Sequence, residues 1–564
     1  MEMYHRIEAI VRDTLSECVT RGDLPEGALG EKVVVEKPKR AEHGDFATTV
    51  CLQLARMAKK SPRDVARSLL THLVDKDGIV ESCEVAGPGF VNFKVRSEVW
   101  REAVREVVRE GPAFGRSDVG QGRRVLVEFV SANPTGPLHV GHARGAVLGD
   151  TVAALLDWTG FQVEREYYIN DVGKQVDVLG RSLWIRYRQQ CGHAIELPEK
   201  HYPGAYLVEI AKALHGELGD TLAAQDYEAE PEPFRSFAKA RIIESIKKDL
   251  LLLGIVHDRW YSEQTLHEAR KLHAVVERLR ERGHIRTDEE GRQWFDSSTL
   301  GDDEDRVVMR GNGVPTYFAA DIAYHEDKLL RSDHCINVWG ADHHGYIARV
   351  KASLAALGYD PARLEILLYQ FVNLVEGGQQ VRMGKRGGVF ETLADLIDEV
   401  GADATRFNLI ARKADAQFEF DLGVAKQQSL DNPVYYVQYG HARICQILAK
   451  AAEAGIATDA QDVDLASLEL PEELELIKKT MDLPWVVRSA AEARGPHHLV
   501  FYLQDLIGTF HAYYTKYKHN ERVISDDATK TQARLYLCRC VRTVLANVLG
   551  LLKLTAPERM YFTE

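Results

Sequence analysis

Closely spaced cysteines are missing from this sequence. Its eight cysteines are scattered through 564 residues, and none forms a Cys-x-x-Cys pair. Zinc ribbons and small disulfide-stabilised folds need such spacing, so the sequence predicts neither. Asp342, His343 and His344 are adjacent and of metal-binding types, but neighbouring side chains of an extended segment point in opposite directions, and no third ligand is spaced to join them. We therefore expect no protein-bound metal.

Long apolar runs and an excess of positive charge are also missing. No run approaches the ~20 apolar residues that span a membrane, and residues 1–8 lack the basic start and apolar centre of a signal peptide. Lys and Arg number 71 against 84 Asp and Glu, which gives a net charge of −13. This balance excludes a protein that coats nucleic acid non-specifically, but not one with a specific RNA partner. We expect a cytoplasmic protein with no membrane partner.

One stretch carries most of the information that is present. Apolar and β-branched residues over 125–130 predict a short buried strand, and Asn133–Pro137 must turn the chain because two prolines and a glycine continue neither strand nor helix. From His139 the apolar residues recur at helical spacing as far as Gly160, which suits a helix end. A second strand follows over 161–169. This order predicts an α/β fold that opens a parallel nucleotide-binding sheet.

His139 and His142 lie three residues apart at the start of this helix, and so on one face of it. The unpaired N–H groups and the positive dipole end of a helix N-terminus favour an anion. Two imidazoles at this place can donate hydrogen bonds to phosphate oxygens, and Gly141 leaves room for a base or ribose against the backbone. A pair of surface histidines is the alternative, but the strand before them and the helix after them favour a phosphate site.

Two later segments add weaker signals. Residues 377–388 place consecutive cations between two glycine pairs, so this loop can close over polyanionic phosphate, although a basic surface hairpin has the same composition. Tyr435 or Tyr436 shares a helix face with Tyr439 and could stack on unpaired bases, although aromatic stripes more often belong to a core.

The chain divides into three predicted parts, as its length requires more than one core. Residues 1–115 form an α+β unit that ends in a Gly/Pro-containing linker. Residues 120–421 contain the parallel sheet, with a charged and mostly helical insertion at about 180–300, and residues 422–564 are helical. No period of ~20–50 residues repeats, which argues against a solenoid.

Several motifs resemble those of one family. The His139-Val-Gly-His142 motif after a strand, followed later by a Met-x-Lys loop, resembles the class I aminoacyl-tRNA synthetases. Glu128–His139, Trp339–Tyr346 and Asp431–Tyr439 are similar to segments of the bacterial-type arginyl-tRNA synthetases, and the resemblance runs through nearly the full chain.

This resemblance implies a Rossmann-like catalytic domain between an N-terminal α+β tRNA-binding domain and an all-α anticodon-binding domain. It implies that L-arginine and ATP, taken with Mg²⁺, give arginyl-adenylate and pyrophosphate, and that the arginyl group then passes to tRNA(Arg). A monomer is implied as well, as is arginine activation that waits for bound tRNA.

The resemblance also assigns roles to residues of this chain. It assigns catalysis to His139, His142 and Lys385, and ATP binding to these three with Gly141 and Met383. The positions that match arginine contacts are Glu128, Asn133, His139, Tyr317, Asp321, His343 and Glu263. The positions implied to contact tRNA are Tyr435, Tyr436, Tyr439 and Phe46.

The predicted closing loop departs from the family pattern at one position. The family commonly has Met-Ser-Lys, whereas this chain has Met383-Gly384-Lys385. Gly384 removes a hydroxyl group and adds roughly 0.5–1 kcal/mol of backbone entropy to be lost on ordering. Because Lys385 is retained, we expect activity to persist, and slower or weaker loop closure is compatible with it.

Two other functions fit part of the sequence. A catalytically inactive RNA-binding paralogue would keep the fold; Gly384 favours it, whereas the histidine pair, Lys385 and the predicted arginine-binding carboxylates oppose it. A small-molecule nucleotidylyltransferase shares the His-x-Gly-His motif, but it needs neither the helical tail nor the N-terminal unit.

Overall fold

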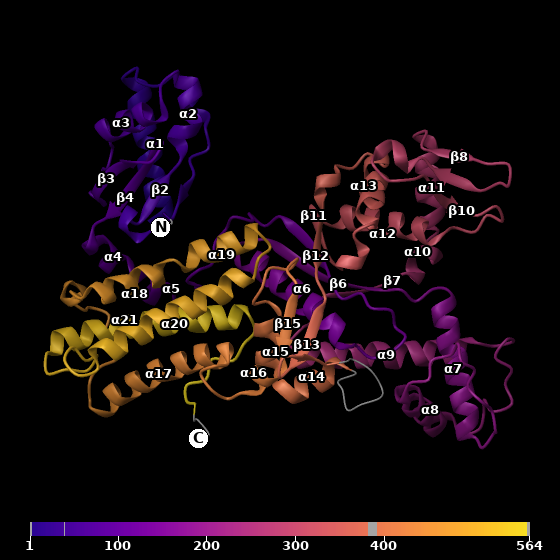
Figure 1. The fold of residues 1–564 in the computed structure, drawn as a ribbon. Coiled ribbons are helices and arrows are strands. Elements are labelled where there is room, and N and C mark those ends of the chain that lie inside the picture. Colours follow the sequence, from indigo (N-terminus) through magenta and orange to yellow (C-terminus); the bar gives the residue numbers. More distant parts are fainter. Residues whose placement is uncertain (1–2, 39, 382–391, 561–564) are drawn as a thin grey trace.

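The chain folds into an N-terminal α+β unit, a central parallel sheet with its helices, and a group of long C-terminal helices (Figure 1). The computed structural model describes residues 3–38, 40–381 and 392–560. The predicted α/β fold class is confirmed. In these described ranges, no helix is both long and apolar enough to cross a membrane.

The N-terminal unit packs three helices on an antiparallel sheet of order β1-β2-β4-β3. Gly87 and Gly89 have positive φ angles and turn the chain between β3 and β4, as the Pro-Gly sequence indicates. The strands are β1 (Val35–Glu36), β2 (Phe46–Thr48), β3 (Val80–Ala86) and β4 (Phe90–Val95). The helices are α1 (Met3–Thr20), α2 (Val50–Ala58) and α3 (Pro62–Thr71), followed by α4 (Ser97–Ala103) and α5 (Arg105–Glu110), which lead to the C-terminal helices.

The central sheet is entirely parallel, with the order β12-β11-β5-β6-β7. Numbered by their position in the chain, these strands follow the order 3-2-1-4-5 of dinucleotide-binding folds, so the connections reverse direction between β5 and β11. The strands are β5 (Arg124–Glu128), β6 (Gln162–Ile169), β7 (Arg259–Ser262), β11 (His334–Gly340) and β12 (Leu364–Tyr369).

Two details of this sheet differ from the sequence predictions. The first strand ends at Glu128, because Val130 and Ser131 have φ angles of +70° and +42° that no strand adopts. The residues at about 180–300, which the sequence predicts to be mostly helical, contain α7 (Lys174–Gln190), α8 (Ala205–Leu218), α9 (Glu232–Leu252), α10 (Gln264–Glu268) and α11 (Lys271–Glu281). They also contain strands, among them β7, which pairs with β6 in the central sheet. Only four residues long, β7 gives too little periodicity to be recognised.

Helix α6 (Val140–Trp158) is the centre of the molecule. It packs against β6 and β11 on one side and against helices α15 (Ala402–Leu409) and α19 (Leu483–Glu492) on others, so it is buried almost all round. Gly160 follows it with a φ of +85°, consistent with the predicted helix end.

The rest of the central part comprises two small sheets and short helices. One sheet is antiparallel and has the order β10-β9-β8, and the other is mixed and has the order β14-β13-β15. Their strands are β8 (Ile285–Thr287), β9 (Gln293–Phe295), β10 (Arg306–Met309), β13 (Val372–Glu376), β14 (Gln379–Gln380) and β15 (Phe418–Asp421). The helices are α10 (Gln264–Glu268), α11 (Lys271–Glu281), α12 (Tyr317–Arg331), α13 (Tyr346–Ala356), α14 (Leu393–Val400), α15 (Ala402–Leu409) and α16 (Leu422–Lys426).

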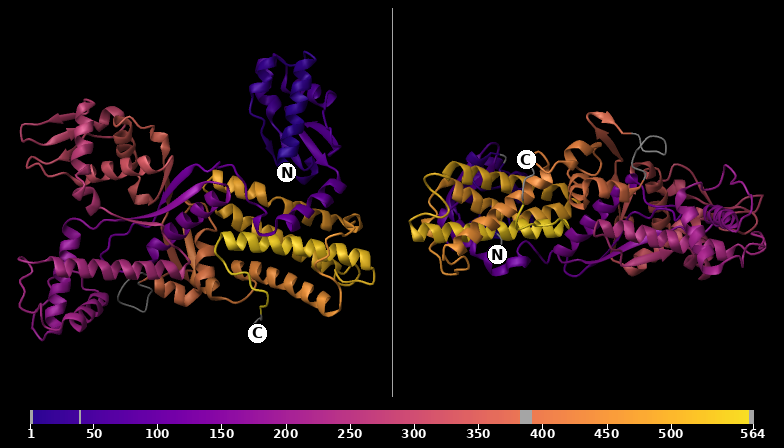
Figure 2. Two further views of the ribbon diagram at one scale, coloured as in Figure 1. Left: turned by 180° about the vertical axis from the view of Figure 1, so that it is seen from behind. Right: turned by 90° about the horizontal axis from the view of Figure 1, so that it is seen from below.

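The C-terminal part is helical, as predicted. Its helices are α17 (Pro433–Glu453), α18 (Pro471–Met481), α19 (Leu483–Glu492), α20 (His497–Tyr517) and α21 (Ala528–Leu551). Both views of Figure 2 place these helices on one side of the central sheet and α7 and α8 at the opposite end.

Candidate active site

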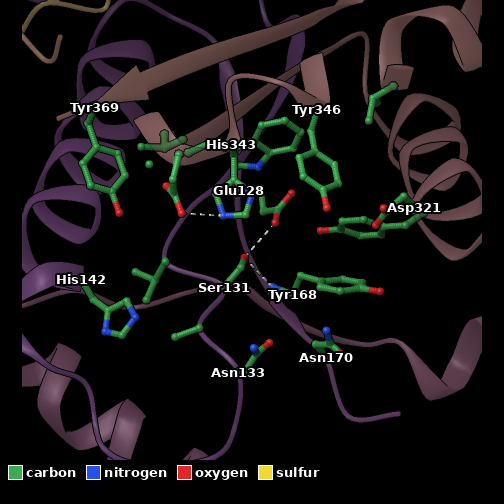
Figure 3. A pocket seen from close by; sticks show the side chains of 18 of the residues that line it. Glu128, Ser131, Asn133, His142, Tyr168, Asn170, Asp321, His343, Tyr346 and Tyr369 are labelled. Carbon is green, nitrogen blue, oxygen red and sulfur yellow. Dashed lines mark hydrogen bonds and ion pairs between the residues drawn. The ribbon is translucent and has the colours of Figure 1, made fainter. Parts of the chain in front are cut away.

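A cavity of about 640 Å³ lies at the carboxyl ends of β5 and β11, where the connections of the sheet reverse direction. Open parallel sheets bind ligands at this place, because the strand ends and the helix N-termini that follow them leave a crevice there. Figure 3 shows His142 on one side of the cavity and Asp321 on the other, with Glu128 between them.

The N-terminus of α6 forms the end of the cavity at which the sequence predicts a phosphate site. The backbone N–H of Gly141 donates to His139 Nδ1 over 3.1 Å, and the backbone N–H of His139 donates to His142 Nδ1 over 3.2 Å. Each ring nitrogen that accepts a backbone proton must be unprotonated, so the proton of each neutral ring is on Nε2. The two side chains therefore cap the helix and keep an N–H donor for a ligand.

Burial keeps both imidazoles neutral. It lowers the pKa of His139, and burial together with the neighbouring His139 ring lowers the pKa of His142 to about 4. At neutral pH the pair therefore offers hydrogen-bond donors without a positive charge of its own.

Gly141 has a local role in the helix cap. A Cβ atom added at this position would lie 2.8 Å from the ring of His139. The missing side chain thus leaves space for the capping imidazole, while room for a base or ribose at Gly141 stays a prediction.

The opposite end of the cavity is rich in carboxylates. Burial and then the charges of Glu263 and Glu128 raise the pKa of Asp321 to about 7, and burial raises the pKa of Glu263. Carboxylates that repel one another in this way gain most from a cationic ligand that lies between them. Tyr168 lies beside this group, and burial followed by the charge of Glu263 raises the pKa of its hydroxyl.

Glu128 is held by a buried lysine. Lys328 is fully buried and pairs with Glu128 Oε2, while Ser131 Oγ donates to Glu128 Oε1 over 2.8 Å. Burial alone would raise the pKa of Glu128, but the charge and hydrogen bond of Lys328 outweigh it and hold that pKa below its usual value. Glu128 is therefore ionised and fixed in position.

The same lysine connects β5 to β11 and α12. Its Nζ donates to Asn337 Oδ1 over 2.7 Å, Asn337 Nδ2 donates to His325 Nε2 over 2.9 Å, and His325 Nδ1 lies 2.8 Å from the backbone oxygen of Asp321. For both contacts of His325 to be satisfied, Nδ1 must carry the proton and Nε2 must accept. These hydrogen bonds connect Lys328, the partner of Glu128, to the backbone of Asp321.

The remaining predicted arginine-site residues also face the cavity. Tyr317 is 58% exposed and stands at its rim as the first residue of α12. Asn133 lies in the loop before α6, and His343 in the turn after β11. His343 Nε2 is 3.7 Å from a carboxylate oxygen of Asp342, but within the described ranges no third metal-ligating group converges with them.

The structure thus brings most of the predicted site into one cavity. The predicted residues that line it are Glu128, Asn133, His139, Gly141, His142, Glu263, Tyr317, Asp321 and His343. The lining residues that sequence reasoning did not assign to a site include Tyr168, Asn170, Tyr324, His325, Trp339, Tyr346, Tyr369 and Phe371. For Tyr168 and Asn170 the sequence holds a signal, since both are polar side chains at the carboxyl end of β6, where open parallel sheets bind ligands.

Several predicted residues lie elsewhere. Met383 and Lys385 are outside the residues that the structure describes. Tyr435, Tyr436 and Tyr439 are half-buried on α17. The rings of Tyr436 and Tyr439 lie 5.2 and 6.1 Å from that of His511 on α20.

The predicted tRNA contact of Phe46 is wrong. Its side chain is 1% exposed, and its ring packs 4.8 Å from Tyr4 and 6.0 Å from Trp100 between centroids. Phe46 therefore belongs to the core of the N-terminal unit and has no face available for RNA.

Comparison with known proteins adds independent information. Three family models match: the arginyl tRNA synthetase N-terminal domain over residues 5–95, the class I (R) tRNA synthetase catalytic domain over 104–419, and the DALR anticodon binding domain over 437–560. The chain is 47% identical to the arginine–tRNA ligase of Syntrophotalea carbinolica, over 99% of this chain and 100% of that protein. It is 45% identical to that of Citrifermentans bemidjiense, with the same coverage. The Thermus thermophilus arginyl-tRNA synthetase structure superposes with a TM-score of 0.76 at 24% identity, covering 99% of this chain and 100% of that one, and so supports the fold.

Proposed function

This chain belongs to the arginyl-tRNA synthetase family, and on that premise we propose how the cavity at the end of its parallel sheet activates arginine. The protein is an arginine–tRNA ligase: it uses ATP to join L-arginine to tRNA(Arg), with AMP and pyrophosphate as the other products. Nothing in the comparisons favours an inactive paralogue. One observation carries the proposed mechanism, namely that neutral imidazole donors and a cluster of carboxylates face each other across one cavity.

Arginine takes the carboxylate-rich end in this proposal. A guanidinium group is planar and permanently charged, so it is matched by the carboxylates of Asp321 and Glu263, with the ring of Tyr317 over it at the rim. Glu128, Asn133 and His343 then surround the α-amino and carboxylate groups. The raised pKa values of Asp321 and Glu263 support this placement, because a guanidinium between them would remove their repulsion.

ATP takes the other end, with its α-phosphate at the N-terminus of α6. The carboxylate of arginine attacks the α-phosphorus, a P–O bond forms, and the bond to pyrophosphate breaks. The Nε2–H groups of His139 and His142 donate to the phosphate oxygens as negative charge develops on them, as the backbone hydrogen bonds to both Nδ1 atoms support. Lys385, which the sequence predicts to lie in a closing loop with Met383, stabilises the leaving pyrophosphate. Mg²⁺ arrives with ATP as part of the substrate.

The arginyl group then passes to the terminal adenosine of tRNA(Arg). The match of the C-terminal helices to an anticodon binding domain supports contacts from that part of the chain, for which Tyr435, Tyr436 and Tyr439 are our candidates. We propose further that the ligase is a monomer, that it acts in the cytoplasm, and that the domains meet near residues 115–120 and 421–422.

Replacement of Asp321 tests the arginine site. We expect Asp321→Asn to raise the KM for arginine in tRNA arginylation by about 10–100-fold, since a hydrogen bond to a charged group contributes about 1.5–3 kcal/mol. The KM for ATP should change little. Asp303→Asn removes an exposed carboxylate outside the cavity and serves as the control. An unchanged KM for arginine in Asp321→Asn would contradict the assignment.

A further inference from the structure

A second cluster of side chains lies far from the cavity, where the ends of α7 and α8 meet. Within the described ranges this is the one group of three metal-ligating side chains that converge: the ligand atoms of Cys191, His215 and Asp220 all lie within 4.8 Å of one another. His215 Nε2 is 3.0 Å from Asp220 Oδ1. The cluster belongs to the helices at the end of the molecule opposite the C-terminal helices (Figure 1).

The backbone brings these donors together in the same way from both helices. Cys191 follows the last turn of α7, and Gly192 then reverses the chain with a φ of +87°. His215 lies in the last turn of α8, and Gly219 reverses the chain before Asp220 with a φ of +57°. The two helix C-termini thus point their negative dipole ends towards one place, which favours a cation there.

A buried tyrosine fixes this arrangement. The hydroxyl of Tyr187, a buried residue of α7, donates to the backbone oxygen of Gly219 after α8. The separation between the two helix ends is therefore set by the fold and does not depend on an ion. His193 follows Cys191 by two residues, which makes it the candidate for a fourth donor.

We propose that Cys191, His215 and Asp220 form a binding site for one zinc ion, with His193 or water in the fourth position. A thiolate, an imidazole and a carboxylate are all donors that zinc accepts in tetrahedral geometry, whereas Mg²⁺ and Ca²⁺ prefer oxygen donors alone. Zinc would displace the thiol proton of Cys191 and the hydrogen bond between His215 and Asp220. The sequence prediction of no bound metal rested on the absence of Cys-x-x-Cys and on the lack of a third ligand for His343 and His344, whereas the pattern here is Cys-x-His followed by His-x₄-Asp.

The site has a structural connection to the active-site loop. Tyr206, at the other end of α8, donates its hydroxyl to the backbone oxygen of Thr135 over 2.5 Å. Thr135 lies in the loop that leads from β5 to His139. An ion that binds both α7 and α8 therefore also stabilises the position of Tyr206, which contacts this loop.

Cobalt binding to the full-length chain tests the proposal, because Co²⁺ takes zinc sites and reports thiolate ligation by a near-ultraviolet charge-transfer band. We expect the chelator-treated protein to bind one Co²⁺ per chain with this band, and zinc to abolish it by displacement. Cys191→Ser should lose the band, and His215→Asn should bind at least about tenfold more weakly, since even groups outside the coordination sphere contribute that much. Cys83→Ser is the matched control, because Cys83 is also half-buried but lies in the N-terminal unit.

The wild-type protein alone can overturn the proposal, so the test does not depend on the variants folding. Absence of a charge-transfer band in the wild type would do so, as would a band that survives in Cys191→Ser or disappears in Cys83→Ser. A zinc-dependent rise in the thermal unfolding midpoint, seen in the wild type and missing in Cys191→Ser, is the expected second readout.

Discussion

The residues that contact the phosphates are neutral donors in this account. The backbone hydrogen bonds to His139 Nδ1 and His142 Nδ1 fix the tautomers, and burial lowers both pKa values. A neutral N–H donor gains strength as charge develops on the phosphate, whereas a fixed cation would also bind the ground state of ATP strongly. The pair is thus suited to raise kcat rather than to tighten ATP binding.

The first prediction at this scale is a loss of turnover without a loss of arginine binding. We expect His142→Ala to lower kcat for arginyl-adenylate formation by about 10²–10³-fold, as for other preorganised donors to a developing oxyanion. The KM for arginine should stay within about twofold, since His142 lies across the cavity from Asp321. His273→Ala, an exposed histidine on α11, is the control. Equal losses in both variants would contradict the assignment.

The second prediction concerns pH and stability. The pKa of His142 is about 4 in the folded chain against 6.5 for a free imidazole. Between these two pH values the unfolded chain binds a proton at His142 that the folded chain does not. The contribution of neutral His142 to the free energy of unfolding is therefore complete above pH 6.5 and is lost as the pH falls towards 4. Asp321 has a raised pKa, so it changes the pH dependence of stability in the opposite sense. The effect of His142 is therefore found by comparing the pH dependence of a His142 variant with that of the wild type.

The free energy of unfolding should decrease less between pH 6.5 and pH 4 in His142→Gln than in the wild type. We expect the two decreases to differ by on the order of 2–3 kcal/mol. Urea denaturation at several pH values measures this slope. A slope identical to that of the wild type would show that His142 titrates normally in the folded chain.

At the scale of elements, the site depends on how β5, β11 and α12 are tied together. Lys328 of α12 binds Glu128 at the end of β5 and Asn337 of β11, and Asn337 in turn binds His325. Every polar atom in this chain of contacts has a partner, and a fully satisfied buried network gives its members a single arrangement.

Removal of the lysine should be costly. We expect Lys328→Met to lower the free energy of unfolding by about 3–5 kcal/mol, because it leaves the charge of Glu128 buried and unpaired. Lys94→Met, which breaks the exposed pair with Glu81, should cost no more than about 1 kcal/mol. Chemical denaturation measures both. Part of the loss should return in Lys328→Met/Glu128→Gln, and equal effects of the two lysine variants would refute the buried pair.

Elements that depend on local patterns were predictable, and those that depend on distant partners were not. The strand over 125–128 and the helix after His139 follow from periodicity and turn residues, and the resemblance supplied Asp321 and Glu263. Lys328 could not be identified, because a lysine in a helix normally faces solvent and only its partners from β5 and β11 explain its burial. The predicted tRNA contact of Phe46 was wrong because its burial depends on Tyr4 and Trp100, which the sequence around Phe46 does not identify as its neighbours.

At the scale of the whole molecule, one buried junction joins the C-terminal helices to α6. Arg406 of α15 donates to Asp150 of α6 over 2.9 Å and to the backbone oxygen of Leu552 over 2.8 Å. Lys553, just after α21, donates to the same carboxylate over 2.7 Å. Asp150 lies in the middle of α6, and His142 lies in the first turn of the same helix, so buried polar contacts connect the C-terminal helices to the helix that carries His142.

Arginine-dependent exchange of pyrophosphate into ATP, with and without tRNA(Arg), tests the central claim most directly, namely that one cavity binds both the guanidinium group and the α-phosphate. The account predicts exchange with arginine and tRNA(Arg), and none when citrulline, which has a neutral ureido group of similar shape, replaces arginine. If arginine supports exchange without tRNA, the claim of a shared cavity stands and only the implied dependence of activation on tRNA is wrong. Exchange without any amino acid, or equal exchange with citrulline, would contradict the claim.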